Sequence, residues 1–322
     1  MRKLLYILPL LLLAACQTGR DVPGIIFDTD LGNDSDDVIA AEILHRAAVK
    51  GEAEILAEIL CKGNPDGVEM LEILQTRYGL SIPIGKFNDW DHRWQWINYA
   101  GAVCRHKPPF PRKGLKEKDI PLSPELYRKT LAEAADGSVT ICAVGFSNIL
   151  APLLDSAPDA YSPLDGRSLI EKKVKRLVMM AGDFKNPGHR EYNVRCFPLQ
   201  TAKVFSEWPT DIVLSPWETG DAVQLPYSAI DSLGDTPLAV AYKAYKPEPY
   251  DEPCFDPTAA LIALGRDDLF TLSPRGNVEV AEDGQTFFTE DPAGRIRYAS
   301  VDSLQASRLL ELITNLISDE IQ

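Results

Sequence analysis

The sequence predicts an α/β fold with a mostly parallel, open sheet that carries helices on both faces. Short apolar runs alternate along the chain with amphipathic stretches. Such alternation is typical of parallel strands joined by helices, because these strands are buried on both faces. Segments rich in polar residues or glycine follow the predicted strands, and ligands bind at the carboxyl ends of such strands. We therefore expect a ligand site along one edge of the sheet.

The predicted elements follow one another from residue 24 onward. Strands are expected at 24–28, 55–61, 139–143, 174–180 and 211–214. The first helix spans about 36–50, since Ile39, Ile43 and Ala47 recur at helical spacing, and further helices lie near 65–78 and 148–154. Ser123 and Pro124 begin another helix, with the serine as its cap. No linker interrupts residues 21–320, so we expect a single domain there.

Residues 1–16 resemble a bacterial lipoprotein signal peptide. Arg2 and Lys3 precede an apolar run at 4–13, which is too short to span a membrane. The run ends in Leu13-Ala14-Ala15-Cys16, similar to the sequence at which a lipid is attached to the cysteine. We expect a lipoprotein anchored to the cell envelope through Cys16. Gln17 is not the aspartate typical of inner-membrane retention, so an outer-membrane or periplasm-facing position is expected.

Charge and cysteine content narrow the functional classes. A net charge of -14 argues against a surface that binds nucleic acid or anionic membranes, so the lipid is the expected membrane contact. Five cysteines remain after Cys16, without a C-x-x-C pair, which argues against a zinc site or a dense disulfide framework. Cys61 and Cys142 lie in apolar runs and are interpreted as core residues. A bridge among Cys104, Cys196 and Cys254 is left open.

A run of acidic residues follows the first predicted strand. Asp28, Asp30, Asp34, Asp36 and Asp37 place five carboxylates within ten residues. This much negative charge is costly unless a cation compensates it, and hard oxygen ligands without Cys or His favour Ca²⁺ over Mg²⁺. The alternative is an acidic loop that caps the next helix, although one cap needs only one aspartate.

The string D-T-D-L-G-N-D-S-D-D resembles the opening signature of the inosine-uridine type nucleoside hydrolases, with two more residues between the glycine and the final aspartate pair. Further segments between residues 24 and 265 are similar to family motifs in the same order, and they include Lys62-Gly63-Asn64, Glu191-Tyr192-Asn193 and Phe255-Asp256-Pro257. The resemblance implies the Rossmann-like nucleoside hydrolase fold.

The resemblance also implies roles for individual residues. Calcium would be bound by Asp30, Asp37, Asp256 and the main-chain carbonyl of Ala143, and Asp30 would also take a proton from a calcium-bound water. The ribose would be bound by Asp36, Asn64, Met180, Asn186, Glu191 and Asn193. Phe255 either faces the base as a substrate-binding residue or packs in the core.

Three segments depart from the family pattern. Phe255 stands where a histidine would protonate the leaving base, and phenylalanine carries no proton. Residues 194–200 differ from the usual run, and so does the loop 86–96, in which Trp90, Trp94 and Trp96 either stack on a base or pack within the protein. His92 and His189 are candidate substitute acids, although exposed histidines are the more common case in polar loops. Without an acid, ribosides with good leaving groups should react fastest.

The leading hypothesis is a calcium-dependent hydrolase of ribonucleosides or related N-ribosides that releases ribose and base for salvage. One alternative is a non-catalytic ribose- or nucleoside-binding lipoprotein. The other is a phosphatase of the haloacid dehalogenase type, suggested by Asp28-x-Asp30 but disfavoured by Gly32. The identity of the base and a homo-oligomeric state are left open.

Overall fold

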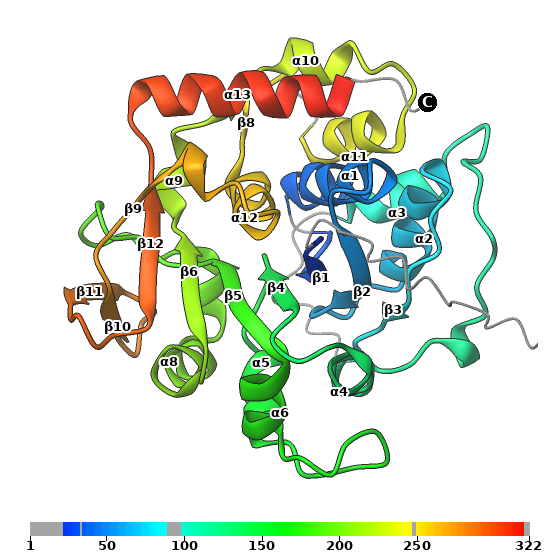
Figure 1. The fold of residues 1–322 in the computed structure, drawn as a ribbon. Helices are drawn as coiled ribbons and strands as arrows, with labels where there is room; N and C mark the ends of the chain where they lie inside the picture. The colour runs from blue at the N-terminus through cyan, green and yellow to red at the C-terminus, as the bar shows by residue number, and fades with distance from the viewer. Residues whose placement is uncertain (1–21, 33, 89–97, 247–248, 319–322) are drawn as a thin grey trace, which may run out of the picture.

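The computed structural model describes residues 22–32, 34–88, 98–246 and 249–318. Its main sheet has ten strands in the order β11-β10-β12-β6-β5-β4-β1-β2-β3, with β9 paired to β12 (Figure 1). The strands are β1 Gly24–Thr29, β2 Glu54–Leu60, β3 Ile84–Gly85, β4 Val139–Ala143, β5 Val174–Met180, β6 Asp211–Ser215, β9 Thr271–Leu272, β10 Gly276–Val280, β11 Thr286–Glu290 and β12 Ile296–Ser300. Seven neighbouring strands of this order, β12-β6-β5-β4-β1-β2-β3, pair in parallel. The pairs β10–β11, β10–β12 and β9–β12 are antiparallel.

Helices cover both faces of this sheet, which confirms the predicted fold class. One face carries α1 Asp36–Val49, α2 Gly67–Arg77, α3 Tyr99–Cys104, α11 Pro237–Tyr245, α12 Phe255–Ala263 and α13 Ser303–Ser318 (Figure 1). The other carries α4 Ser123–Glu133, α5 Leu150–Asp155, α6 Gly166–Lys173 and α8 Pro198–Glu207. The remaining helices are α7 Tyr192–Cys196, α9 Trp217–Asp221 and α10 Tyr227–Asp231, and β7 Gln224–Leu225 pairs with β8 Glu252–Pro253.

The central strands divide the core into two apolar layers. Ile25 and Phe27 of β1 pack in the layer beneath α1 and α12, whereas Ile26 packs in the layer beneath α4 and α5. Side chains of a strand point alternately to opposite faces, so an uninterrupted apolar run supplies both layers. The apolar residues of β1 are therefore consecutive because the strand is buried on both faces. Polar residues follow where the strand ends, at the edge of the sheet where ligands bind.

Several predicted details can be compared with the structure. The five central strands and α1 lie within one or two residues of their predicted bounds. Ser123 is the first residue of α4, and it does not cap the helix as expected, because its hydroxyl donates to the carbonyl of Leu60 at 2.7 Å. The five described cysteines are buried free thiols, so no bridge forms among Cys104, Cys196 and Cys254. Cys16, Trp90, His92, Trp94 and Trp96 lie outside the described residues.

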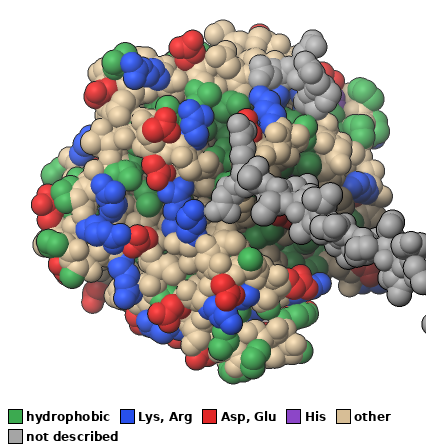
Figure 2. Space-filling view, viewed as in Figure 1, with side chains coloured by type: hydrophobic (Ala, Val, Ile, Leu, Met, Phe, Trp, Pro, Cys, Tyr) green, Lys and Arg blue, Asp and Glu red, His purple; other side chains and the backbone are tan. Residues whose placement is uncertain are grey.

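The surface carries mixed charge. On the face shown in Figure 2, Lys and Arg side chains are interspersed with Asp and Glu. None of the helices in the described ranges has the length and apolar character needed to cross a bilayer.

Candidate active site

A cavity of about 190 Å³ lies at the carboxyl ends of the central strands. It brings together residues that follow β1, β4, β5 and β6 in the chain, as expected for a parallel sheet. Six predicted site residues line it, namely Asp30, Met180, Glu191, Asn193, Phe255 and Asp256. The other lining residues are Asp34, Val144, His189, Arg190, Tyr192, Arg195 and Trp217.

Buried carboxylates form one end of the site. Asp30 follows β1, Asp36 and Asp37 form the first turn of α1, and Asp256 lies in the first turn of α12. The main-chain N–H of Asp256 donates to Asp36 Oδ2 at 2.9 Å, so the two helix starts are joined directly. The hydroxyl of Thr29 donates to Asp37. We refer to Asp30, Asp36, Asp37 and Asp256 as the acidic cluster.

The acidic cluster lacks sufficient compensating charge. Burial, followed by the neighbouring Asp30, raises the pKa of Asp37 well above its usual range, and Lys62 offsets this only in part. Burial and the charge of Asp36 likewise raise the pKa of Asp256. Carboxylates that repel one another in a buried site favour either a proton or a bound cation.

The donor chemistry of the cluster fits a hard cation. Asp36 Oδ1 is buried without a hydrogen-bond partner among the described residues, and a buried oxygen left in that state is costly. Carboxylate oxygens are the ligands that Ca²⁺ and Mg²⁺ prefer. In the described part of the chain, however, no group of three or more His, Cys, Asp or Glu side chains has the arrangement of a metal site. The metal therefore remains a prediction supported by charge and ligand type.

Glu191 and Asn193 connect the loop after β5 to α7. The Glu191 carboxylate accepts from the N–H groups of Asn193 at 2.6 Å and Gly182 at 3.1 Å. Burial raises the pKa of Glu191 to about 7, although these main-chain donors act in the opposite direction. The Asn193 side chain donates to the carbonyls of Val144 at 2.9 Å and Met180 at 3.2 Å. Both side chains are therefore held in place at the cavity wall.

Three predicted residues are placed differently. Asn64 lines a separate cavity of about 530 Å³, and its amide donates to the carbonyl of Leu31 at 3.1 Å, close to the turn at Gly32. Asn186 donates to the Asp183 carboxylate at 2.9 Å. Ala143 ends β4, and the next residue, Val144, lines the active-site cavity. These three residues adjoin the site, and their proposed ligand contacts remain predictions.

A row of three aromatic side chains also lines the cavity. The ring of His189 lies 4.6 Å from that of Trp217, and Trp217 lies 6.0 Å from Phe255, measured between ring centroids. We call these three residues the aromatic row. Sequence analysis assigned no role to Trp217, although its position directly after β6 placed it at the ligand edge.

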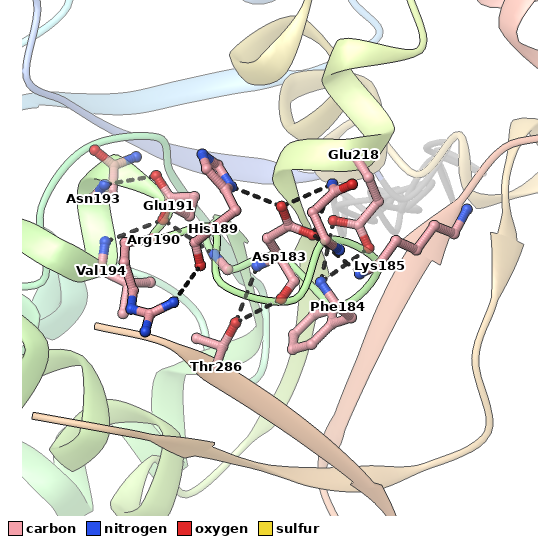
Figure 3. Close-up of polar contacts among 12 residues, drawn as sticks. Asp183, Phe184, Lys185, His189, Arg190, Glu191, Asn193, Val194, Glu218 and Thr286 are labelled. Atoms are coloured by element: carbon pink, nitrogen blue, oxygen red, sulfur yellow. Dashed lines mark hydrogen bonds and ion pairs between the residues drawn. The ribbon is translucent and has the colours of Figure 1, made fainter. Parts of the chain in front are cut away.

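Asp183 orients the histidine of this row. His189 Nδ1 lies 2.7 Å from Asp183 Oδ2, and the Asp183 carboxylate also accepts from the N–H groups of Lys185 and Asn186 (Figure 3). Burial acts to raise the pKa of Asp183, but the hydrogen bonds from Asn186 and Lys185 outweigh it and leave the pKa below its usual value. Burial raises the pKa of Glu218, which lies beside Asp183, to about 7. The hydrogen bonds therefore favour the ionised form of Asp183, whereas burial favours the protonated form of Glu218.

Comparison with known proteins places this site in a family context. The family model described as inosine-uridine preferring nucleoside hydrolase matches residues 25–307. No curated protein sequence matches the chain.

Solved structures share its fold. A plant nucleoside hydrolase is 20% identical, with a TM-score of 0.68, and the match covers 92% of this chain and 99% of that one. The inosine-uridine preferring nucleoside hydrolase from Bacillus anthracis is 19% identical, with a TM-score of 0.69 and the same coverage. The type III effector XopQ, solved with adenosine diphosphate ribose, is 13% identical, with a TM-score of 0.66 and coverage of 92% and 93%.

Proposed function

The chain belongs to the inosine-uridine preferring nucleoside hydrolase family of N-glycosyl hydrolases, and we propose that it cleaves ribonucleosides or related N-ribosides in a calcium-dependent reaction. One observation supports this most strongly. A single cavity at the carboxyl ends of the strands combines Asp30 and Asp256 of the acidic cluster with Glu191, Asn193 and an aromatic row. Carboxylates suit a sugar and a cation, and aromatic rings suit a base.

The acidic cluster would activate water. Asp30, Asp37, Asp256 and the carbonyl of Ala143 would hold calcium, which when bound would orient a water molecule and ease its deprotonation. Asp30 would act as general base and take a proton from the attacking water. The reaction passes through a positively charged, oxocarbenium-like sugar, and the negative charge of the cluster stabilises that sugar.

The remaining residues select the substrate. Asp36 and Asn64 are proposed to bind the ribose 2′- and 3′-hydroxyls, and Met180, Asn186, Glu191 and Asn193 its 5′ end. A 2′-deoxy analogue would leave buried polar groups unpaired, at a cost of about 1 to 3 kcal/mol per group. Phe255 and Trp217 would face the base, since both line the cavity.

Location and assembly are further parts of the proposal. Leu13-Ala14-Ala15-Cys16 supports a lipid anchor at Cys16 in the cell envelope, where the enzyme would act on external nucleosides for salvage. Replacing Cys16 with serine should release the protein from membranes or leave it uncleaved. Unchanged membrane fractionation of that variant would contradict the anchor. No partner other than the small-molecule substrate is proposed, and homo-oligomer formation is left to measurement.

Incubation of the protein with Ca²⁺ and a panel of nucleosides tests the activity, with free ribose as the product measured. The panel includes inosine, uridine, nicotinamide riboside and nitrophenyl riboside. Adenosine diphosphate ribose is added because a structural relative was solved with it, and free adenine is the product measured there because its riboses stay bonded to the diphosphate. Release of ribose, or of adenine from adenosine diphosphate ribose, supports the proposal. Tight binding without release would instead favour the non-catalytic lipoprotein. Release of phosphate from an added phosphomonoester, with no ribose from the panel, would favour the haloacid dehalogenase alternative.

A further inference from the structure

The leaving base requires a proton that Phe255 cannot supply. Phe255 lines the cavity directly before Asp256, so the position itself is part of the site. Among the described residues that line this cavity, His189 is the one imidazole. It belongs to the same aromatic row as Phe255, with Trp217 between them. A proton donor at His189 would therefore act on the side of the site that faces the base.

The surroundings of His189 suit a proton donor. A carboxylate accepts only, so the bond to Asp183 places a hydrogen on Nδ1. The other nitrogen, Nε2, is turned away from Asp183 (Figure 3). The His189 side chain is 36% exposed, whereas Asp183 is 1% exposed, so the ring can exchange protons with water while its carboxylate partner stays buried.

We propose that His189, oriented by Asp183, donates the proton to the leaving base, in place of the histidine that Phe255 replaces. This inference rests on the proposed N-ribohydrolase function. In the same arrangement Asp183 is a positioning residue, because it acts through His189 and lines no part of the cavity.

The step conserves atoms and charge. The electron pair of the bond between C1′ and the base nitrogen moves to the base, and a ring nitrogen of the base takes the proton from Nε2. Water bonds to C1′ through its oxygen and gives up one proton to Asp30. Asp30 releases that proton to solvent, and His189 regains one from solvent. The net reaction converts riboside and water into ribose and the neutral free base.

Comparison of two substrates tests the assignment. Inosine requires protonation of its base, whereas nitrophenyl riboside leaves as a stable anion. In His189→Gln, kcat/KM for inosine should fall by about 10² to 10⁴-fold, the usual contribution of a general acid, and nitrophenyl riboside should lose far less. Asp183→Asn should show the same selectivity with a smaller loss. His106→Gln is the matched control, since His106 pairs with Asp235 and stacks on Phe110, outside the cavity.

A pH profile separates proton donation from a structural role. The charged and titratable groups near His189 include Asp183 in the preceding turn, Glu218 and Asp221 of α9, and Arg190 and Glu191 of its own segment. In the unmodified protein the ratio of kcat/KM for inosine to that for nitrophenyl riboside should decline as the pH rises, since the donor loses its proton. In His189→Gln this decline should disappear. Glu218→Gln should keep it, which excludes Glu218 as its source.

The outcomes distinguish this inference from the function on which it rests. Cleavage of nitrophenyl riboside by His189→Gln proves that the variant is folded, so a selective loss of inosine hydrolysis supports the assignment. Inosine hydrolysis within about threefold of the unmodified protein would overturn it and leave the hydrolase intact. An unmodified protein that cleaves nitrophenyl riboside but not inosine would also overturn it. An unmodified protein that cleaves neither would overturn the proposed function and this inference together.

Discussion

Helix α1 carries two buried polar clusters that differ in how their charge is balanced. At its start, Asp36 and Asp37 belong to the acidic cluster, whose carboxyl groups raise one another's pKa. In its middle, His45 pairs with Glu58, and Glu42 lies 3.9 Å from Arg46 and 3.7 Å from Arg77. We call this second group the mid-helix cluster. Both clusters include residues of α1, but only the mid-helix cluster contains positively charged side chains, those of Arg46 and Arg77.

The contrast indicates what each cluster is for. The mid-helix cluster contains the basic side chains of Arg46 and Arg77, so the charge of Glu42 is balanced within the protein. Gln75 donates to Glu58 at 2.6 Å, whereas Glu42 Oε1 and His45 Nδ1 have no hydrogen-bond partner among the described residues. In the acidic cluster, the charge of Lys62 lowers the pKa of Asp37, but burial and the neighbouring carboxylates outweigh it. A buried charge without a partner is unstable, so the missing positive charge is expected from a ligand. The four predictions below test this division between a ligand site and a structural cluster.

Substitution in the acidic cluster should have the largest effect. Asp37→Ala removes a proposed calcium ligand, and kcat/KM should fall by about 10³-fold, comparable to the loss of a main electrostatic stabiliser of the transition state. The matched control is Glu42→Gln, which changes a carboxyl group of the same helix in the mid-helix cluster and should leave kcat/KM within about threefold. The ribose-release assay measures both. Equal losses in the two variants would remove the distinction between the clusters.

Substitution in the mid-helix cluster should instead affect stability. His45→Ala leaves Glu58 with Gln75 but without its imidazole partner, and breaking such a buried pair costs about 3 kcal/mol. Denaturant unfolding measures this loss, and kcat/KM of the folded fraction should be unchanged. A variant with full stability but reduced activity would show that the mid-helix cluster serves the reaction.

Calcium should stabilise through the acidic cluster alone. At about 100 times its Kd a ligand adds about 2.7 kcal/mol, and about 1 kcal/mol moves the melting temperature of a large domain by about 2 °C. Chelation should therefore lower the melting temperature by about 5 °C in the unmodified protein and in His45→Ala. In Asp37→Ala it should have no effect. Identical melting curves of the unmodified protein with calcium and with chelator would contradict the metal site.

The smallest effect concerns Glu218, which lies beside the carboxyl group of Asp183 and so resembles the acidic cluster on a smaller scale. Its pKa is raised from 4.5 to about 7, mainly by burial. Between these values the folded protein keeps a proton that the unfolded chain has lost, so stability falls as the pH rises from 4.5 to 7. Glu218→Gln should remove about 1 kcal/mol of this decline, measured by unfolding across that range. An unchanged pH slope would contradict the assigned proton.

Most of the central fold could be predicted because it depends on local patterns. Each of β1, β2, β4, β5 and β6 contains a short apolar run, so each was recognised without knowledge of its neighbours. The added strands β9 to β12 were not predicted. Their pattern is weaker, since β11 exposes Phe287 while it buries Thr286, the reverse of what hydrophobicity indicates. Thr286 is buried because its hydroxyl exchanges hydrogen bonds with the main chain of Asp183.

The residues of the candidate site also differ in whether a local sequence pattern identifies them. Asp30, Glu191, Asn193 and Asp256 occur in short motifs that could be compared with a family, and all four line the cavity. Phe255 also lies in such a motif and His189 was a candidate acid, but Trp217 had no assigned role. No motif joins the three residues of the aromatic row, because they come from three segments that meet only in the folded chain. Asn64 matched a motif, but its amide is used to hold the carbonyl of Leu31, a contact that depends on the turn at Gly32.

Helix α13, near the C-terminus, packs against α1, near the N-terminus. Leu309, Ile313 and Ile317 are buried in the same apolar layer as α1, and Arg46 of α1 donates to the carbonyl of Ile317 at 3.1 Å. Among the described helices, α1 comes first in the chain and α13 last, so the earliest helix obtains part of its apolar cover from the latest one. The core around α1 therefore stays incomplete until residues 303–318 have been synthesised. For the export proposed above, this order would leave more time in which the chain is still unfolded.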